Sequence, residues 1–245
     1  MKLLVSVKNA EEVVDAIEGG ADIVDVKDPS AGSLGLPDLD IVKEVIALVR
    51  NWHGREVSMA LGDVDTVERN LKYIAFVGGV IGVDYIKVGL ATDKYDIATE
   101  IARQVAHTLK SFSKTKLVLV GYADYLYVNT VEPLKVVEVA VKVDADGVMI
   151  DTLRKNGLST PDILSIDYLK LFVEEAHKAG LFAAIAGGLR SSHIPLCMRL
   201  GFDVLGVRGA VCERGRDGKI SRELAKLFKT KLIEKQAHNV RKECC

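Results

Sequence analysis

Asp25 and Lys27 alternate with apolar residues in the run Asp-Ile-Val-Asp-Val-Lys at positions 22–27. Side chains alternate across a β-strand, so Asp25 and Lys27 share one face and Val24 and Val26 lie on the other. Removing an ammonium or a carboxylate from water is costly unless its charge is compensated. The pair is therefore either a structural ion pair or part of a site that meets solvent and substrate. The second interpretation is favoured, because ionisable groups buried in a cleft often mark function.

Three further charged residues end or follow similar apolar runs. Lys87 ends the run at 84–87, Asp151 ends the run at 148–151, and Lys155 follows on a loop, where a solvated lysine is an equally good interpretation. Neighbouring cations and desolvation both favour loss of a proton from an amine, and a neutral amine can attack a carbonyl carbon. Carboxylates beside such an amine can move protons. We therefore predict Schiff-base chemistry by the set Lys27, Asp25, Lys87, Asp151 and Lys155.

Glycines follow two later strand-like runs, in Ala-Gly-Gly-Leu-Arg at 186–190 and Val-Arg-Gly-Ala at 207–210. Backbone N–H groups beside bare glycine can converge on an anion, and loops late in a barrel often bind phosphate. Tight turns would also explain these glycines, but their place in the chain order favours a phosphate site. Its predicted members are Gly187, Gly188, Arg208 and Gly209, and the predicted ligand is a small phosphorylated sugar.

The sequence contains no metal-binding pattern of histidines or cysteines, neither His-Glu-x-x-His nor Cys-x-x-Cys. A carboxylate site for Mg²⁺ could be formed by Asp63, Asp124 and Asp151, but lysines in the same space would compete with the cation. We predict neither a metal nor an organic cofactor.

Eight short β-branched runs alternate with longer amphipathic stretches, a pattern typical of parallel strands joined by crossover helices. A doubly wound open sheet would alternate in the same way, but eight even units without a glycine-rich dinucleotide turn after the first strand favour a closed barrel. In a barrel the polar residues above fall at the carboxyl ends of the strands, where active sites form. The predicted strands are 3–7, 22–27, 57–61, 84–88, 116–120, 147–151, 181–186 and 203–207.

The helical patterns between these strands complete an α/β fold, a (β/α)₈ TIM barrel. A length of 245 residues and a 49% hydrophobic composition suit one such domain over residues 1–245, with a frayed tail at 237–245. The predicted helices are 10–18, 40–49, 66–76, 95–109, 133–141, 166–178 and 223–234.

The net charge of −1 gives no reason to expect a nucleic-acid partner. No apolar run approaches the roughly 20 residues that cross a bilayer, and the first residues lack the length and cleavage site of a signal peptide. We predict a cytoplasmic protein without a membrane partner, and expect a homo-oligomer because apolar positions on barrel helices often serve self-association.

The motifs at these positions resemble those of one family along nearly the whole chain. They are Met-Lys-Leu-Leu-Val-Ser-Val at 1–7, Gly-Ala-Asp-Ile-Val-Asp-Val-Lys-Asp-Pro at 20–29, Gly-Ser-Leu-Gly at 32–35, Tyr-Ile-Lys-Val-Gly-Leu at 85–90, Asp-Thr-Leu at 151–153 with Lys155, and Ala-Gly-Gly-Leu at 186–189. The chain resembles (5-formylfuran-3-yl)methyl phosphate synthase, an enzyme of methanofuran biosynthesis in methanogenic archaea.

This resemblance implies a lyase that condenses two molecules of glyceraldehyde 3-phosphate into a phosphorylated hydroxymethyl-furaldehyde, losing one phosphate and water. It also implies that Lys27 is the Schiff-base lysine, and that Asp25, Lys87, Asp151 and Lys155 move protons and hold phosphate. An iminium on Lys27 would acidify the neighbouring carbon for bond formation and for elimination. Asp25 and Asp151 both remain candidates for the first base.

Three other functions are compatible with parts of this pattern. A class I aldolase acting on triose phosphates needs the same lysine and phosphate site but stops after condensation. A decarboxylase of the orotidine-phosphate type has a second acid where Ser30 stands here. A non-catalytic barrel that binds sugar phosphates would not gather three lysines and several acids at one mouth.

Overall fold

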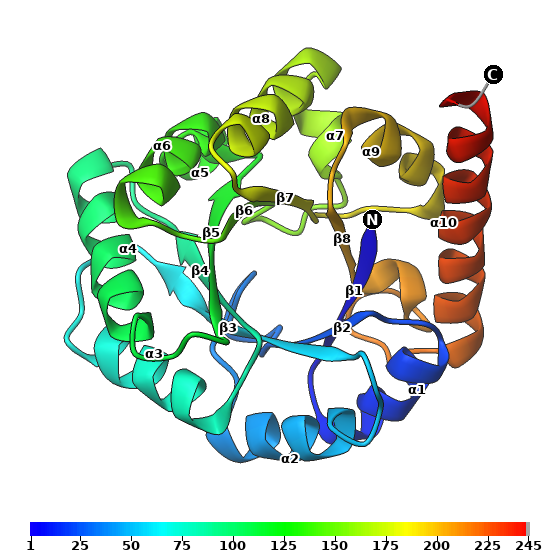
Figure 1. Cartoon of the computed structure of the whole chain (residues 1–245), viewed down its shortest axis with the longest axis horizontal. Helices are drawn as coiled ribbons and strands as arrows, with labels where there is room; N and C mark the ends of the chain where they lie inside the picture. The colour runs from blue at the N-terminus through cyan, green and yellow to red at the C-terminus, as the bar shows by residue number, and fades with distance from the viewer. Residues whose placement is uncertain (244–245) are drawn as a thin grey trace.

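Eight parallel strands close into a barrel in the computed structural model, which describes residues 1–243, with side chains described as far as Gln236 (Figure 1). Each strand pairs with its neighbours in chain order, and β8 pairs with β1. The predicted TIM barrel is confirmed. The strands are β1 (Lys2–Val7), β2 (Ile23–Val26), β3 (Glu56–Val64), β4 (Tyr85–Leu90), β5 (Lys116–Tyr122), β6 (Gly147–Asp151), β7 (Phe182–Ile185) and β8 (Val204–Val207).

Alternate residues of each strand face the barrel interior and the surrounding helices. In β1, for example, Leu4 packs into a small interior cluster with Ile23 and Met149, whereas Leu3 and Val5 join the large cluster beneath the helices. Val and Ile supply most of the outward layer, because branched side chains pack well on a pleated surface. The same alternation turns Asp25 and Lys87 inward, as their strand positions predict.

The helices form an outer ring around the strands (Figure 1). Side-chain caps begin two of them, where Asp38 accepts a hydrogen bond from the Asp40 N–H and Ser165 accepts one from the Tyr168 N–H. The helices are α1 (Val13–Glu18), α2 (Leu39–Val49), α3 (Asn70–Ile81), α4 (Tyr95–Leu109), α5 (Tyr125–Val128), α6 (Pro133–Val143), α7 (Thr160–Ile163), α8 (Ile166–Lys178), α9 (Ile194–Leu200) and α10 (Arg222–Glu243), with 3₁₀ turns η1 (Ala10–Glu12), η2 (Ser191–His193) and η3 (Gly209–Val211).

Helix α3 departs from its predicted bounds of 66–76 at both ends. It starts at Asn70 and continues through two glycines to Ile81, where Gly82 ends it in a left-handed conformation. Gly78 and Gly79 do not stop the helix, because they let it pack closely on its neighbours. A Cβ added at Gly78 would lie 2.7 Å from Ile86 Cδ1, and one at Gly79 would lie within 3 Å of the Phe112 ring.

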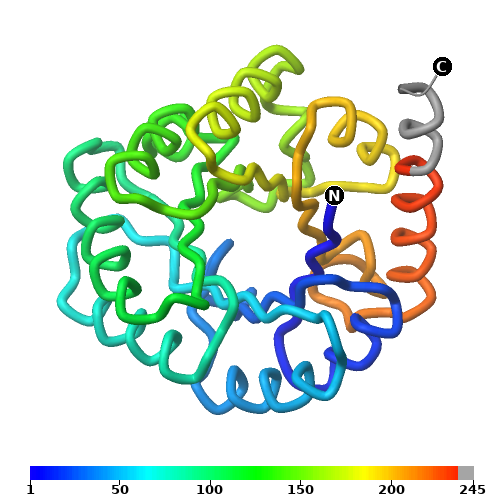
Figure 2. The backbone as a smooth tube through the Cα atoms, viewed as in Figure 1, coloured from blue at the N-terminus to red at the C-terminus, as the bar shows by residue number. Residues whose placement is uncertain are grey.

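Helix α10 closes the ring by packing beside α1 (Figure 2). Arg222 of α10 forms ion pairs with Asp15 at 3.2 Å and Glu18 at 2.5 Å. The backbone of α10 is helical to Glu243. The predicted frayed tail at 237–245 has its side chains and its last two residues outside the described part of the chain.

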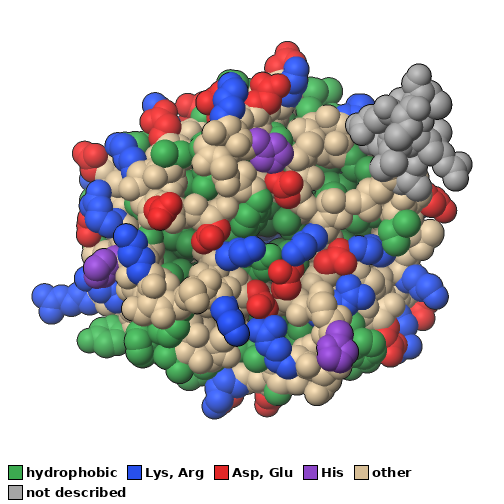
Figure 3. Space-filling model, viewed as in Figure 1, with side chains coloured by type: hydrophobic (Ala, Val, Ile, Leu, Met, Phe, Trp, Pro, Cys, Tyr) green, Lys and Arg blue, Asp and Glu red, His purple; other side chains and the backbone are tan. Residues whose placement is uncertain are grey.

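Charges of both signs are interspersed on the face drawn in Figure 3, with no broad area of one sign. This mixture agrees with the net charge of −1. Among the described residues, no helix combines the length and the apolar character that a membrane span requires.

Candidate active site

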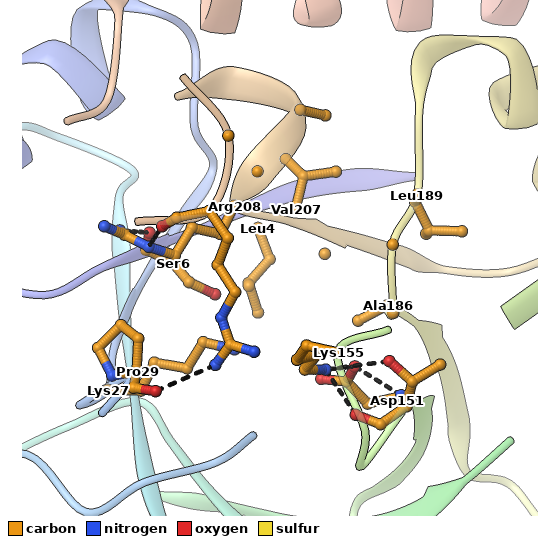
Figure 4. Close-up of a pocket in the computed structure, with 18 of the residues that line it drawn as sticks. Leu4, Ser6, Lys27, Pro29, Asp151, Lys155, Ala186, Leu189, Val207 and Arg208 are labelled. Atoms are coloured by element: carbon orange, nitrogen blue, oxygen red, sulfur yellow. Dashed lines mark hydrogen bonds and ion pairs between the residues drawn. The ribbon is translucent and has the colours of Figure 1, made fainter. Parts of the chain in front are cut away.

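A cavity of about 520 Å³ lies at the carboxyl ends of the strands. Figure 4 shows Lys27 and Pro29 on one side of it and Asp151 and Lys155 on the other. All of the predicted site residues except Asp25 line it, and Asp25 lies directly behind Lys87. The polar lining is Ser6, Lys27, Lys87, Asp151, Thr152, Lys155, Arg190, Arg208, Arg216 and Asp217, together with glycines 157, 187, 188, 206, 209 and 215.

Asp25 pairs with Lys87, not with Lys27. Its Oδ2 accepts hydrogen bonds of 2.8 Å from Lys87 Nζ and from the Ser6 hydroxyl, and all three side chains are buried. Strand register makes this possible, because Ser6 lies beside Asp25 across the β1–β2 pair. Burial raises the pKa of Asp25, but the Lys87 and Lys27 cations outweigh it, so the pKa lies below its ordinary value. Asp25 is therefore a carboxylate at neutral pH.

Lys27 is a buried lysine of the cavity without a carboxylate partner in the described chain. Its Nζ donates a hydrogen bond of 3.0 Å to the Ser33 carbonyl, and in the described chain it forms no ion pair within 4 Å. Burial lowers the pKa of Lys27 to about 8, with the Asp151 carboxylate opposing the shift and the Lys87 and Lys155 cations adding to it. A substantial fraction of this amine is therefore neutral near pH 8, the form that attacks a carbonyl.

Asp151 and Lys155 form the second ion pair of the cavity, at 2.8 Å. Lys155 Nζ also donates to the Thr152 carbonyl at 2.5 Å, and the Thr152 N–H donates to Asp151 at 2.7 Å. Although burial raises the pKa of Asp151, Lys155 and Lys27 hold it well below the ordinary value. The Lys155 side chain is 25% exposed, so it is neither a fully solvated loop lysine nor a core residue.

Hydrogen bonds hold the loop at 28–35 against the loop after β6 and the end of β3. The Ser33 hydroxyl donates to the Thr152 carbonyl at 2.9 Å, which joins the loop after β2 to the loop after β6. Asp63, near the end of β3, accepts from the Ser33 N–H at 2.7 Å and from the Leu34 N–H, and also from the Tyr122 hydroxyl. Gly89 leaves the space in the barrel that the Tyr122 hydroxyl occupies.

Two of the three carboxylates considered for Mg²⁺ accept hydrogen bonds from backbone N–H groups. Asp63 binds the loop at 28–35, and Asp124 accepts from the N–H groups of Leu153 and Arg154 at 2.8 and 2.9 Å. Among the side chains that the structure describes, as far as Gln236, no group of three or more histidines, cysteines, aspartates or glutamates is placed to hold a metal ion.

The predicted phosphate glycines form the opposite wall. Gly187 and Gly188 have positive φ angles of 86° and 63°. Gly187 also lies too close to α7 for a side chain, because an added Cβ would be 2.5 Å from Thr160 Oγ1. The tight geometry that the sequence suggested is present, and both glycines line the cavity, Gly187 buried and Gly188 exposed, while phosphate binding here stays a prediction.

Arg208 lies at the cavity but directs its side chain behind it. Its guanidinium forms a bidentate pair with Glu12 at 2.8 and 3.1 Å, and it also donates to the carbonyls of Ser6, Arg216 and Gly218. Only 4% of the Arg208 side chain is exposed. Its predicted contact with phosphate stays untested, and the described contacts already occupy its guanidinium.

A family model described as 4-HFC-P synthase matches residues 3–229. The chain belongs to this family.

Two archaeal members named (5-formylfuran-3-yl)methyl phosphate synthase support the assignment. The one from Methanococcus maripaludis strain C5 is 41% identical over 230 residues, covering 92% of this chain and 97% of the relative. The one from Methanosarcina barkeri strain Fusaro is also 41% identical, over 231 residues that cover 91% and 96% of the two chains. The predicted family is confirmed.

The barrel is also similar to a solved structure of 3-hexulose-6-phosphate synthase from Salmonella typhimurium, with a TM-score of 0.67 and 18% identity over 96% of this chain and 100% of the other. At that identity the likeness concerns the fold.

Three side chains of this candidate site in a 4-HFC-P synthase family member were missed by sequence reasoning. Ser33 and Thr152 carry hydroxyls without a distinctive charge, and Arg216 lies nine residues beyond the last strand. The signal for Ser33 was present in the Gly-Ser-Leu-Gly motif at 32–35, whose chemical role the sequence alone did not disclose.

Proposed function

We propose that this protein forms (5-formylfuran-3-yl)methyl phosphate from two molecules of glyceraldehyde 3-phosphate, releasing one phosphate and two waters, in methanofuran biosynthesis. The supporting observation is a buried lysine, Lys27, whose pKa of about 8, set by burial and by the charges of two nearby carboxylate–ammonium pairs, suits a Schiff-base nucleophile. Relatives named for this product supply the substrate class.

In this proposal the neutral Lys27 amine attacks the aldehyde carbon of one triose phosphate, and loss of water gives an iminium. The iminium withdraws electrons, so a carboxylate can remove a proton from the adjacent carbon to form an enamine. The enamine carbon then bonds to the aldehyde carbon of the second molecule. Loss of phosphate and of two further waters, ring closure and hydrolysis of the imine release the furan and restore the lysine, so that two waters leave in all.

The two ion pairs supply the proton transfers. The charges of both pairs act on the pKa of Lys27, and Asp151 with Lys155 lies across the cavity from it. In each pair the carboxylate can accept a proton and the ammonium can donate one. Thr152 holds this pair in place, because its N–H donates to Asp151 and its hydroxyl oxygen accepts a hydrogen bond from Lys155.

The phosphate groups are assigned to the wall formed by Gly187, Gly188 and Gly209, with Arg208 beneath it. Neither a metal nor an organic cofactor enters the scheme. We place the enzyme in the cytoplasm, because its anionic substrates do not cross membranes unaided. A homo-oligomer stays a prediction.

The test is mass spectrometry of the protein incubated with glyceraldehyde 3-phosphate and then reduced with sodium borohydride, alongside ultraviolet spectra of the products. Lys27→Ala should lose the adduct and the furaldehyde absorption. Lys170→Ala, which removes an exposed lysine of α8, should retain both. An adduct on Lys27 without furan would indicate an aldolase that stops after condensation. The absence of adduct and turnover in the parent protein would refute the proposal and favour a non-catalytic sugar-phosphate-binding barrel.

A further inference from the structure

The loop at 212–220, after β8, brings a second arginine to the cavity. An antiparallel bridge between Cys212 and Ile220 closes the base of this loop, and the Glu213 N–H donates to the Lys219 carbonyl at 2.9 Å. Arg216 lies at its tip and lines the cavity. Its Nη2 donates to the carbonyls of Gly32 at 3.0 Å and Pro29 at 3.4 Å, so the guanidinium lies against the loop that carries Ser33.

Arg208 and Arg216 differ in how many donors they have left. A guanidinium has five N–H donors. Arg208 makes five hydrogen bonds, two with Glu12 and three with carbonyls. Arg216 makes two, both through Nη2, so within the described chain its Nε and Nη1 have no protein acceptor.

The two arginines differ in charge compensation as well. Glu12 neutralises Arg208 in a buried pair. No carboxylate of the described residues lies within 4 Å of the Arg216 guanidinium, which meets neutral carbonyls instead. Arg190, a third arginine of the lining, is 63% exposed and lies 3.8 Å from Asp162. Arg216 is thus a half-buried cation with free donors.

Arg216 also adjoins the predicted phosphate wall. A Cβ added at Gly209 would lie 3.4 Å from the Arg216 backbone nitrogen, so the glycine packs directly against this loop. Arg208 Nε donates to the Arg216 carbonyl at 2.8 Å, which links the loop to the buried pair with Glu12. The pair therefore sets the position of Arg216 from behind the cavity.

We propose that Arg216 binds the phosphate group of a triose phosphate through Nε and Nη1, and that Arg208 and Glu12 are positioning residues that hold its loop. The planar fork of arginine matches two phosphate oxygens, and such charge-assisted pairs are strong. The assignment to a triose phosphate rests on the proposed function. The anion site itself does not, because it follows from the free donors and uncompensated charge.

Calorimetric titration with inorganic phosphate tests the site without any imine chemistry. Arg216→Gln should weaken phosphate binding roughly 10- to 100-fold, the effect of losing hydrogen bonds to a charged group. Arg216→Lys keeps the charge but loses the planar fork, so its affinity for phosphate should lie between those of Arg216→Gln and the parent protein. Arg199→Gln, which removes an exposed arginine of α9 that does not line the cavity, should bind within about twofold of the parent protein.

Thermal melting of the same variants separates binding from folding. Arg216→Gln should melt close to the parent protein, whereas Arg208→Gln should melt lower because Glu12 loses its buried partner. Equal phosphate affinity of Arg216→Gln and the parent protein, or no saturable binding by the parent protein, would overturn the proposal. Phosphate binding that depends on Arg216 without any furan product would instead sustain the anion site and contradict the proposed function.

Discussion

The Ser33 carbonyl accepts a hydrogen bond of 3.0 Å from Lys27 Nζ, while the N–H of the same residue donates to Asp63 at 2.7 Å. One residue therefore carries an acceptor for the proposed nucleophile and the anchor of its own loop. Asp63 acts on Lys27 through this loop, at a distance from the reacting atoms.

Replacing Asp63 with alanine should release the loop at 28–35 and slow imine formation on Lys27. The variant leaves the N–H groups of Ser33 and Leu34 and the Tyr122 hydroxyl without their acceptor. Each buried donor left unsatisfied should lower the free energy of unfolding by about 1–3 kcal/mol. Denaturant unfolding and the rate of adduct formation measure the two effects. Tyr122→Phe is the matched control, because it removes one donor and leaves the loop bonds in place. An Asp63→Ala variant with parental adduct rates would exclude the positioning role.

Adduct formation should depend on pH through Lys27. The neutral amine attacks, so the rate should rise from pH 6 and level off above the pKa of about 8. Lys155 lowers this pKa, so Lys155→Met should move the midpoint to higher pH. Rates of reductive trapping at saturating reductant, measured from pH 6 to 10, give both midpoints. Lys170→Met should leave the midpoint in place, and a downward shift in Lys155→Met would contradict the assigned electrostatics.

Replacing Lys87 with methionine should destabilise the protein by roughly 3–5 kcal/mol, because Asp25 would keep a buried charge without its partner. The pKa of Asp25 is lowered in the folded state, so the stabilising contribution is present above about pH 4 and is lost as the pH falls through the folded-state value. Urea unfolding at pH 7 and at lower pH measures this dependence. The double variant Asp25→Asn with Lys87→Met should recover part of the loss at pH 7, and a double variant as unstable as Lys87→Met would argue against an uncompensated charge.

Gly187→Ala should abolish turnover and lower stability. The change adds a Cβ at φ 86°, 2.5 Å from Thr160 Oγ1 and 2.9 Å from the Thr152 nitrogen, so the walls after β6 and β7 must move. Gly54→Ala is the control, since its φ of 72° is also positive but its surroundings are open. The control should lose only about 1–2 kcal/mol from backbone strain. Equal melting temperatures and activities of the two variants would show that crowding at Gly187 does not matter.

The strands and most of the polar face were predictable because they depend on local patterns. The run at 22–27 places Asp25 and Lys27 on one face whatever the rest of the chain does. The ion-pair partner of Asp25 could not be predicted, because Lys87 is 62 residues away in the sequence. The register of β2, β3 and β4 brings the two side chains together. Helix α4 was predicted at its observed bounds, whereas α3 was predicted to end at residue 76 and continues to Ile81, where its glycines pack closely on tertiary neighbours.

The pairing of Arg208 could not be predicted from the sequence either, because it depends on a residue far away in the chain. Its place beside glycines suggested an anion site, but its buried partner Glu12 lies 196 residues earlier. Nothing in the residues around position 208 discloses that pairing. The hydrogen bonds of Ser33 and Asp63 depend likewise on loops that meet only in the closed barrel.

Six cationic and two anionic side chains line the cavity, in a protein whose formal net charge is −1. Asp25 and Glu12 lie behind two of the cations, so a net positive charge remains at the mouth. Such a mouth attracts dianions before they touch it, and salt screens this attraction within about 8–10 Å. Substrate capture should therefore be an encounter guided by long-range electrostatics, with kcat/KM falling as sodium chloride is raised. The same field would retain the phosphate that leaves, which makes product escape a candidate for the slow step of each catalytic cycle.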